Sequence, residues 1–154
     1  MDGASDAGLC RASDDCASVA EDGELDGKAV RCGEPERVVG TDVLLALERL
    51  ELASGARLLE IGCGWGSFAE LAAAHGHHVT GLTLSAEQQA YARRRLGAHA
   101  AIAQRDYRDE HGRYDAVVSI EMIEAVGERW WPAYFAKIAE VLPAGGRAQV
   151  QAIV

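Results

Sequence analysis

The chain has 154 residues, a formal net charge of −9 and an isoelectric point near 5.0. This length suits one domain with a core of its own, and so acidic a chain is a poor partner for nucleic acid, because the phosphates would repel it. The sequence contains no apolar run of about 18 or more residues, and its acidic start does not resemble a signal peptide, so we expect a cytoplasmic protein.

The first 40 residues differ in composition from the rest of the chain. They carry ten acidic and four basic side chains, few large apolar ones, and glycines that interrupt any periodicity. We therefore expect residues 1–40 to be an acidic, poorly ordered segment and residues 41–154 to be the globular domain. The cysteines and histidines show no spacing typical of a metal site, so we expect no bound metal.

The globular part begins with a predicted helix. Thr41 or Asp42 can cap it, apolar side chains such as Leu47 share one face at helical spacing, and the helix ends near residues 53–55. Residues 57–61 follow as an apolar run without polar alternation. That pattern is typical of a parallel strand that is covered on both faces.

A glycine-rich loop follows this strand, with Gly62, Gly64 and Gly66 in the sequence GCGWG. A helix with Ser67 as its expected N-cap and a second strand over residues 78–82 come next. A strand, a glycine loop, a helix and a strand form the βαβ unit of nucleotide-binding folds. The ligand of such a unit binds at the loop.

The residues around the loop favour one ligand over another. A dinucleotide fingerprint requires G-x-G-x-x-G and an acidic residue about 20 positions later. Here the third glycine comes one residue early, and the second strand runs into Thr83 without a carboxylate. Glu60 lies two residues before the first glycine, where a carboxylate suits a ligand that carries an ammonium group and a sulfonium charge. We therefore expect S-adenosylmethionine rather than NAD.

The remaining predicted elements continue the alternation of strands and helices. They are a helix that opens with a capping box at Ser85 and Gln88, a short strand over 101–103, a strand over 116–120, a helix over 132–142 and a strand over 147–154. This order predicts an α/β fold with a doubly wound, mostly parallel sheet. Because the chain stops at an apolar edge strand, we expect a fragment, a truncated product or a chain that relies on a partner there.

Several stretches between about Leu50 and Val154 resemble one protein family. They are LLEIGCGWGSFAELAAAHGHHVTGLTLSAEQQAYA, RDYRD, YDAVVSIEMIEAVGERWWPAYF and LPAGGRA. The chain is similar there to the cyclopropane-fatty-acyl-phospholipid synthases and mycolic acid cyclopropane synthases, a branch of the class I S-adenosylmethionine-dependent methyltransferases. The resemblance implies a Rossmann-like class I methyltransferase sheet whose C-terminal strands are missing, so that the domain at 41–154 is incomplete.

The resemblance also implies a cofactor site at the strand ends. The methionine part of the cofactor would lie near the glycine loop, the ribose near the end of the second strand and the adenine near the RDYRD segment. The residues implied are Glu60, Gly62, Cys63, Gly64 and Gly66 at the first place, Thr83, Leu84, Ser85 and Gln88 at the second, and Asp106 and Tyr107 at the third. Hydroxyl and amide groups at Thr83 and Gln88 would replace the missing ribose carboxylate.

By the same resemblance, Glu124 is the residue expected to take part in catalysis. In such synthases a lipid double bond attacks the sulfonium methyl group, and the resulting carbocation loses a proton before the ring closes. The family assigns that proton to a bound bicarbonate, which the glutamate matching Glu124 helps to hold. Glu121 is a weaker candidate, and Ala125 stands where many members have histidine. The family's tyrosine-serine-cysteine segment has no match in residues 1–40.

Three functions stay open at this point. The first is a methyltransferase of the cyclopropane synthase type that modifies unsaturated acyl chains of phospholipids, with contact to the inner membrane face and self-association through the exposed sheet edge. Trp130 and Trp131 could anchor at a membrane surface, although we favour core packing or partial exposure for these two rings. The second is a truncated, non-catalytic module that binds S-adenosylmethionine. The third is a fragment of a nicotinamide-dependent oxidoreductase.

Overall fold

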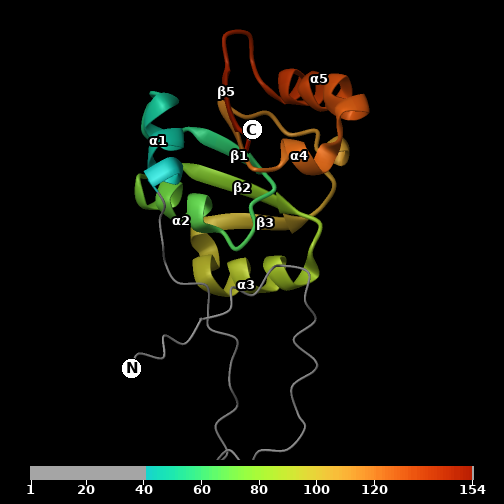
Figure 1. Cartoon of the computed structure of the whole chain (residues 1–154). Helices are drawn as coiled ribbons and strands as arrows, with labels where there is room; N and C mark the ends of the chain where they lie inside the picture. The colour runs from blue at the N-terminus through green and yellow to red at the C-terminus, as the bar shows by residue number, and fades with distance from the viewer. Residues whose placement is uncertain (1–40, 154) are drawn as a thin grey trace, which may run out of the picture. The chain divides into compact units, whose positions relative to one another are not determined.

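A computed structural model describes residues 41–153 of the chain. The expectation of poor order for residues 1–40 lies outside this range. Within it, strands alternate with helices along the chain (Figure 1). The elements are α1 (Thr41–Arg49), β1 (Arg57–Ile61), α2 (Ser67–Ala74), β2 (His78–Thr83), α3 (Ala86–Leu96), η1 (Gly97–His99), β3 (Ala100–Gln104), η2 (Tyr107–Asp109), β4 (Ala116–Ile120), α4 (Ile123–Val126), η3 (Glu128–Trp130), α5 (Trp131–Val141) and β5 (Arg147–Gln151).

The strands form one sheet in the order β3-β2-β1-β4-β5, and every neighbouring pair is parallel. The predicted α/β class with a parallel sheet is therefore confirmed. The apolar strands β1 and β4 occupy the interior of the sheet, as their sequences require. In the register, Ile61 pairs with Leu82 and Thr83 pairs with Gln104, so the carboxyl ends of β1, β2 and β3 meet at one edge.

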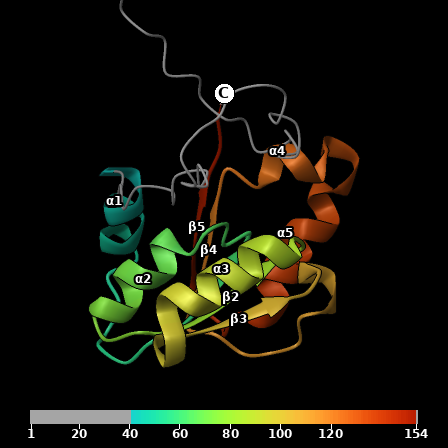
Figure 2. The same ribbon diagram turned by 90° about the horizontal axis from the view of Figure 1, so that it is seen from below.

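Helices cover both faces of the sheet, as a doubly wound fold requires. On one face α1, α2 and α3 lie in one layer (Figure 2), and Phe68 and Leu96 pack with Leu58 of β1. On the other face α5 contributes Tyr134 and Ile138, which pack with Leu59. Because successive residues of a strand point to opposite faces, the run of apolar residues in β1 supplies both cores.

Two predicted helix ends differ from the structure. Ser67 is the first residue of α2 and not its cap: Gly66 occupies the cap position with a φ of 86°, and no side chain caps the helix. The first helix ends at Arg49 rather than near residue 53, because Glu51 adopts a φ of 47°, which a helix cannot contain. The side chains of the expected caps Thr41 and Asp42 lie outside the description.

The C-terminal elements are close to the prediction. α5 spans Trp131–Val141 with a proline in its first turn, and β5 ends at Gln151, three residues before the predicted end. β5 forms one edge of the sheet. In the described part of the chain, no helix combines the length and the apolar character needed to cross a membrane.

Candidate functional site

A cleft of about 330 Å³ lies at the carboxyl edge of the sheet. Open parallel sheets bind their ligands at this edge, where the loops after the strands meet. Most of the predicted cofactor residues line the cleft, whereas Glu60, Cys63 and Gly66 do not. The lining residues are Ile61, Gly62, Gly64, Leu82, Thr83, Leu84, Ser85, Gln88, Arg105, Asp106, Tyr107 and Met122.

The glycine loop is fixed to the second strand. The backbone N–H groups of Gly62 and Cys63 both donate to the carbonyl oxygen of Leu82, over 3.0 and 2.8 Å. Gly64 lines the cleft with a φ of 51°, and a Cβ placed on it would meet no atom within 4 Å among the described residues, its two chain neighbours excepted. The open space beside Gly64 is therefore available for a ligand that approaches the backbone closely.

Gly66 has a different role from the other loop glycines. A Cβ on Gly66 would lie 3.0 Å from Cδ1 of Leu96 and 3.2 Å from Cβ of Ala92, and its φ of 86° disfavours any other residue. The glycine therefore lets α3 pack tightly against the loop. Its contribution to the cleft is the position of the loop and not a contact surface.

A pair of polar side chains lies at the end of β2. The hydroxyl of Thr83 donates to Oε1 of Gln88 over 2.7 Å and accepts from the Ser85 N–H over 3.2 Å. Ser85 caps α3 as predicted, because its hydroxyl accepts from the Gln88 N–H. The reciprocal bond of a capping box is made by Thr83 and not by the Gln88 side chain. The Nε2 group of Gln88 keeps N–H donors that a ligand can use.

The segment after β3 brings a carboxylate and an aromatic ring to the cleft. Both oxygens of Asp106 accept hydrogen bonds from Arg108, over 2.9 and 2.6 Å, and chiefly this contact lowers the pKa of Asp106. Tyr107 lies edge-on to the buried Tyr134, with ring centroids 5.3 Å apart. Asp106 therefore stays ionised, and the Tyr107 ring is held by a neighbour of fixed position.

Glu60 is buried beside the glycine loop. Only 5% of its surface is exposed, and its Oε2 has no hydrogen-bond partner among the described residues. Burial raises the pKa of Glu60 to about 8, and the Ala69 N–H offsets part of that rise. The structure thus places Glu60 behind the loop, against α2, rather than in the cleft.

Cys63 also points away from the cleft. Its side chain packs over Gly81, where an added Cβ would lie 2.9 Å from the Cβ of Cys63. Burial, together with the charge of Glu60, raises the pKa of the Cys63 thiol to about 12. The thiol is therefore protonated and serves the packing between the loop and β2.

Glu124 lies in the first turn of α4 and does not line the cleft. It is exposed, and its Oε1 accepts a hydrogen bond from the Ile153 N–H. Two residues earlier, Met122 lines the cleft and packs over Gly62. Glu121, at the end of β4, has a φ of 53° and donates its N–H to the Gln151 carbonyl.

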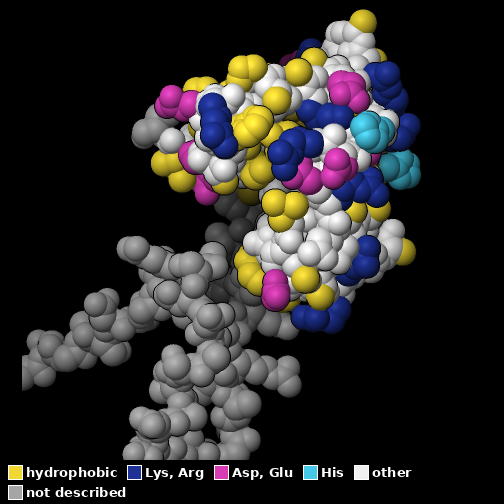
Figure 3. Space-filling view, turned by 90° about the vertical axis from the view of Figure 1, so that its right-hand side faces the viewer, with side chains coloured by type: hydrophobic (Ala, Val, Ile, Leu, Met, Phe, Trp, Pro, Cys, Tyr) yellow, Lys and Arg dark blue, Asp and Glu magenta, His cyan; other side chains and the backbone are white. Residues whose placement is uncertain are grey.

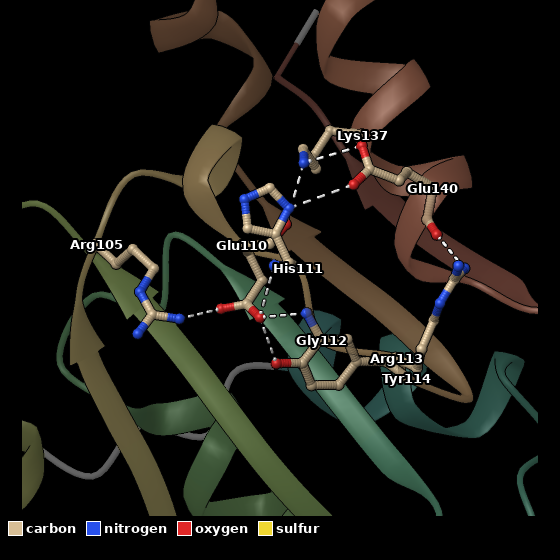
Figure 4. Close-up of polar contacts among 8 residues, drawn as sticks. All are labelled: Arg105, Glu110, His111, Gly112, Arg113, Tyr114, Lys137 and Glu140. Carbon is tan, nitrogen blue, oxygen red and sulfur yellow. Dashed lines mark hydrogen bonds and ion pairs between the residues drawn. The ribbon is translucent and has the colours of Figure 1, made fainter.

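Sequence reasoning missed a buried carboxylate behind the cleft. Glu110 is 4% exposed, and Arg105, which lines the cleft, donates to its Oε2 over 2.7 Å (Figure 4). Although burial opposes ionisation, hydrogen bonds from the Gly112 N–H and Arg105 hold the pKa of Glu110 below its usual value. In the sequence Glu110 is one of many charged residues. Only the folded structure distinguishes it, by bringing its hydrogen-bond partners around the carboxylate.

The donor set of the cleft fits an adenosine compound. Amide and hydroxyl groups lie at the end of β2, an aromatic ring and a carboxylate follow β3, and open backbone lies at Gly64. Among residues 41–153, no group of three or more histidine, cysteine, aspartate or glutamate side chains could hold a metal ion.

The fold and the position of the cleft define the Rossmann-like architecture of class I methyltransferases. The family model described as mycolic acid cyclopropane synthetase matches residues 40–154. The chain belongs to this family.

Individual relatives agree with this assignment. The chain is 50% identical over 105 residues to the tuberculostearic acid methyltransferase UfaA1 of Mycobacterium tuberculosis, a match that covers 64% of this chain and 24% of that protein. It is 43% identical over 93 residues to the cyclopropane-fatty-acyl-phospholipid synthase of Escherichia coli, a match that covers 59% of this chain and 24% of that protein. The chain thus spans about a quarter of the length of these relatives.

A solved structure shows the same fold. The crystal structure of mycolic acid cyclopropane synthase CmaA1 in complex with SAH and CTAB superposes with a TM-score of 0.64 at 29% identity. The match covers 67% of this chain and 38% of that one. The described domain therefore corresponds to part of a larger methyltransferase fold.

Proposed function

We propose that the chain binds S-adenosylmethionine in the cleft and forms the cofactor-binding part of a methyltransferase of the cyclopropane synthase type. The observation that carries this proposal is the cleft itself, in which an open backbone at Gly64 and the Thr83–Gln88 pair flank one space. The family membership and the SAH in the CmaA1 structure support it.

Each part of the cleft suits one part of this cofactor. The Gln88 amide can donate hydrogen bonds to the ribose hydroxyls. It would replace the carboxylate that accepts from these hydroxyls in a dinucleotide site. Asp106 can accept from the exocyclic amine of adenine while Arg108 keeps it ionised, and the Tyr107 ring offers an apolar face. Of the predicted site residues outside the cleft, Glu60, Cys63 and Gly66 would support the loop from behind.

The proposed acceptors are unsaturated acyl chains of phospholipids. The cofactor supplies an electrophilic methyl group, and a double bond can attack it without prior deprotonation. The carbocation formed in this step must later lose a proton. We assign its removal to a bound bicarbonate that Glu124 helps to hold, with the bicarbonate hydroxyl donating a hydrogen bond to the Glu124 carboxylate. In support, Glu124 lies on α4, two residues after Met122 of the cleft.

A second function is favoured by the surroundings of Glu124. Its carboxylate is exposed and already accepts from the Ile153 N–H, so it is not aimed into the cleft in this structure. A non-catalytic module that binds S-adenosylmethionine would show the same features. A nicotinamide-dependent oxidoreductase is disfavoured, because β2 ends in Thr83 and not in the carboxylate that a dinucleotide ribose requires.

Acceptors of this kind require contact with a membrane surface. Trp130, Trp131 and Phe135 are 46%, 38% and 47% exposed on η3 and α5, and hydrophobic side chains gather beside Lys and Arg on the face shown in Figure 3. We propose a cytoplasmic protein that touches the inner membrane face there, since tryptophan suits the boundary of lipid and water. The edge strand β5 is the proposed place of self-association.

Two measurements test these proposals. Calorimetric titration with S-adenosylhomocysteine and with NADH separates the cofactor classes, and binding of NADH alone would refute the methyltransferase. Incubation with S-adenosylmethionine and unsaturated phospholipid vesicles, followed by mass spectrometry, detects one added methylene unit per chain. Glu124→Gln should lose this turnover and keep S-adenosylhomocysteine binding. Turnover equal to the wild type would remove Glu124 from the chemistry, and no turnover in either protein would favour the non-catalytic module.

A further inference from the structure

The segment that carries Asp106 and Tyr107 is closed by one ion pair. Arg105 precedes these two residues and Glu110 follows them, and Nη1 of Arg105 lies 2.7 Å from Oε2 of Glu110. Within the loop, Asp109 N–H donates to the Asp106 carbonyl, and Glu110 N–H donates to the Tyr107 carbonyl. The pair therefore joins the two ends of a short loop whose middle faces the cleft.

The carboxylate of this pair has a fixed position. Its Oε1 accepts from the Gly112 N–H over 2.7 Å, from the His111 N–H over 3.1 Å and from the Tyr114 hydroxyl over 3.2 Å (Figure 4). Glu110 is buried, whereas the side chain of Arg105 is 48% exposed. The anion is thus the anchored partner, and the cation on the cleft side is held by it.

A buried lysine ties the same loop to α5. Nζ of Lys137 donates to the Glu110 carbonyl oxygen over 3.1 Å and lies 2.9 Å from Oε2 of Glu140. Lys137 is 9% exposed, whereas the Glu140 side chain is 51% exposed. Lys137 of α5 therefore fixes the backbone of Glu110, whereas the side chain of Glu110 holds Arg105 at the cleft.

We propose that Glu110 is a positioning residue for the cofactor cleft: through Arg105 it holds residues 105–107 where Asp106 and Tyr107 can contact the ligand. This inference rests on the proposed function for the identity of the ligand. The holding of the loop by Glu110 does not depend on it.

Glu110→Gln separates this role from general stability. The amide oxygen can still accept from Gly112, His111 and Tyr114, but the amide nitrogen presents donors to the Arg105 guanidinium, which only donates. A hydrogen bond between charged groups is lost at one atom, and the rest of the packing keeps its shape. Glu140→Gln is the matched control, because it removes a carboxylate from the outer end of the same network.

The first readout is amide hydrogen exchange of the unliganded chain. Glu110→Gln should speed exchange at the Asp109 and Glu110 amides about five- to tenfold and leave the Cys63 amide of the glycine loop, which bonds to the Leu82 carbonyl, unchanged. Glu140→Gln should change none of them. Unchanged exchange in Glu110→Gln, or equal acceleration in Glu140→Gln, would overturn the inference. If Glu110→Gln does not fold, Arg105→Gln gives the same test, and Arg105→Lys should restore protection.

The second readout is calorimetric titration with S-adenosylhomocysteine. Glu110→Gln should weaken binding about five- to tenfold, but it should weaken it no further in a chain that already carries Arg105→Gln. Additive effects would show that Glu110 does not act through Arg105 and would overturn the inference. A wild-type chain that binds no S-adenosylhomocysteine would refute the proposed function, and the exchange rates alone would then decide whether Glu110 holds the loop.

Discussion

Replacement of Glu60 by glutamine should stabilise the folded chain at neutral pH and should do so much less near pH 5. The carboxyl group is 5% exposed, and one of its oxygens has no hydrogen-bond partner among residues 41–153. Burial raises the pKa of Glu60 to about 8. Glutamine has nearly the same shape, and its amide oxygen can accept from a backbone N–H as the carboxyl oxygen does.

The sign and size of the effect follow from proton linkage. The unfolded chain releases the Glu60 proton near the ordinary glutamate pKa of 4.5, whereas the folded chain keeps it to about pH 8. Between these values unfolding releases a proton, so the free energy of unfolding falls as the pH rises. The contribution of Glu60 is complete below pH 4.5. At about 1.4 kcal/mol per pH unit, roughly 3 kcal/mol is lost by pH 7.

Urea unfolding between about pH 5 and pH 8.5 measures this contribution. The free energy of unfolding of Glu60→Gln should exceed that of the wild type by an amount that grows from about 1 kcal/mol at pH 5 to about 3 kcal/mol at pH 7. Glu48→Gln, which changes an exposed carboxylate on α1, should follow the wild-type curve. A difference between Glu60→Gln and the wild type that is the same at pH 5 and pH 8 would refute the reasoning.

Two further predictions concern the cleft and its support. Gly66→Ala should lower the free energy of unfolding, measured in urea, by about 1–3 kcal/mol, because the alanine Cβ would press on Leu96 and the backbone φ of 86° disfavours alanine. A loss below about 0.5 kcal/mol would contradict this packing role. Thr83→Val keeps the shape of the side chain but removes the hydroxyl that bonds to Gln88 and Ser85. It should weaken S-adenosylhomocysteine binding about tenfold in calorimetry, and an unchanged dissociation constant would remove Thr83 from the proposed ribose site.

The order of strands and helices could be predicted because it depends on local pattern. The uninterrupted apolar runs of β1 and β4 indicate strands buried on both faces, and the structure places them inside the sheet. Helix ends were less accurate where backbone geometry, and not side-chain type, decides them. Ser67 has the chemistry of a cap, but Gly66 is the residue that can turn into α2 at a positive φ.

The side chains of the site divide in the same way. Residues in loops that follow the strands, such as Thr83 and Tyr107, could be placed at the cleft because parallel strands bring their carboxyl ends to one edge. Glu60 is inside a strand, and alternation puts it on the same face as Leu58, toward α2. Glu110 could not be found, since its burial depends on Tyr114 and Arg105 folding around it.

The carbonyl oxygen of Leu82 connects the glycine loop to the end of β2. It accepts from Gly62 and Cys63 of the glycine loop, and the next residue, Thr83, begins the polar pair with Gln88. A shift of the loop therefore displaces the end of β2 as well, and the distance between the two subsites stays nearly constant. If the cleft binds S-adenosylmethionine as proposed, free methionine or free adenosine would each meet a site already spaced for the two joined in one molecule.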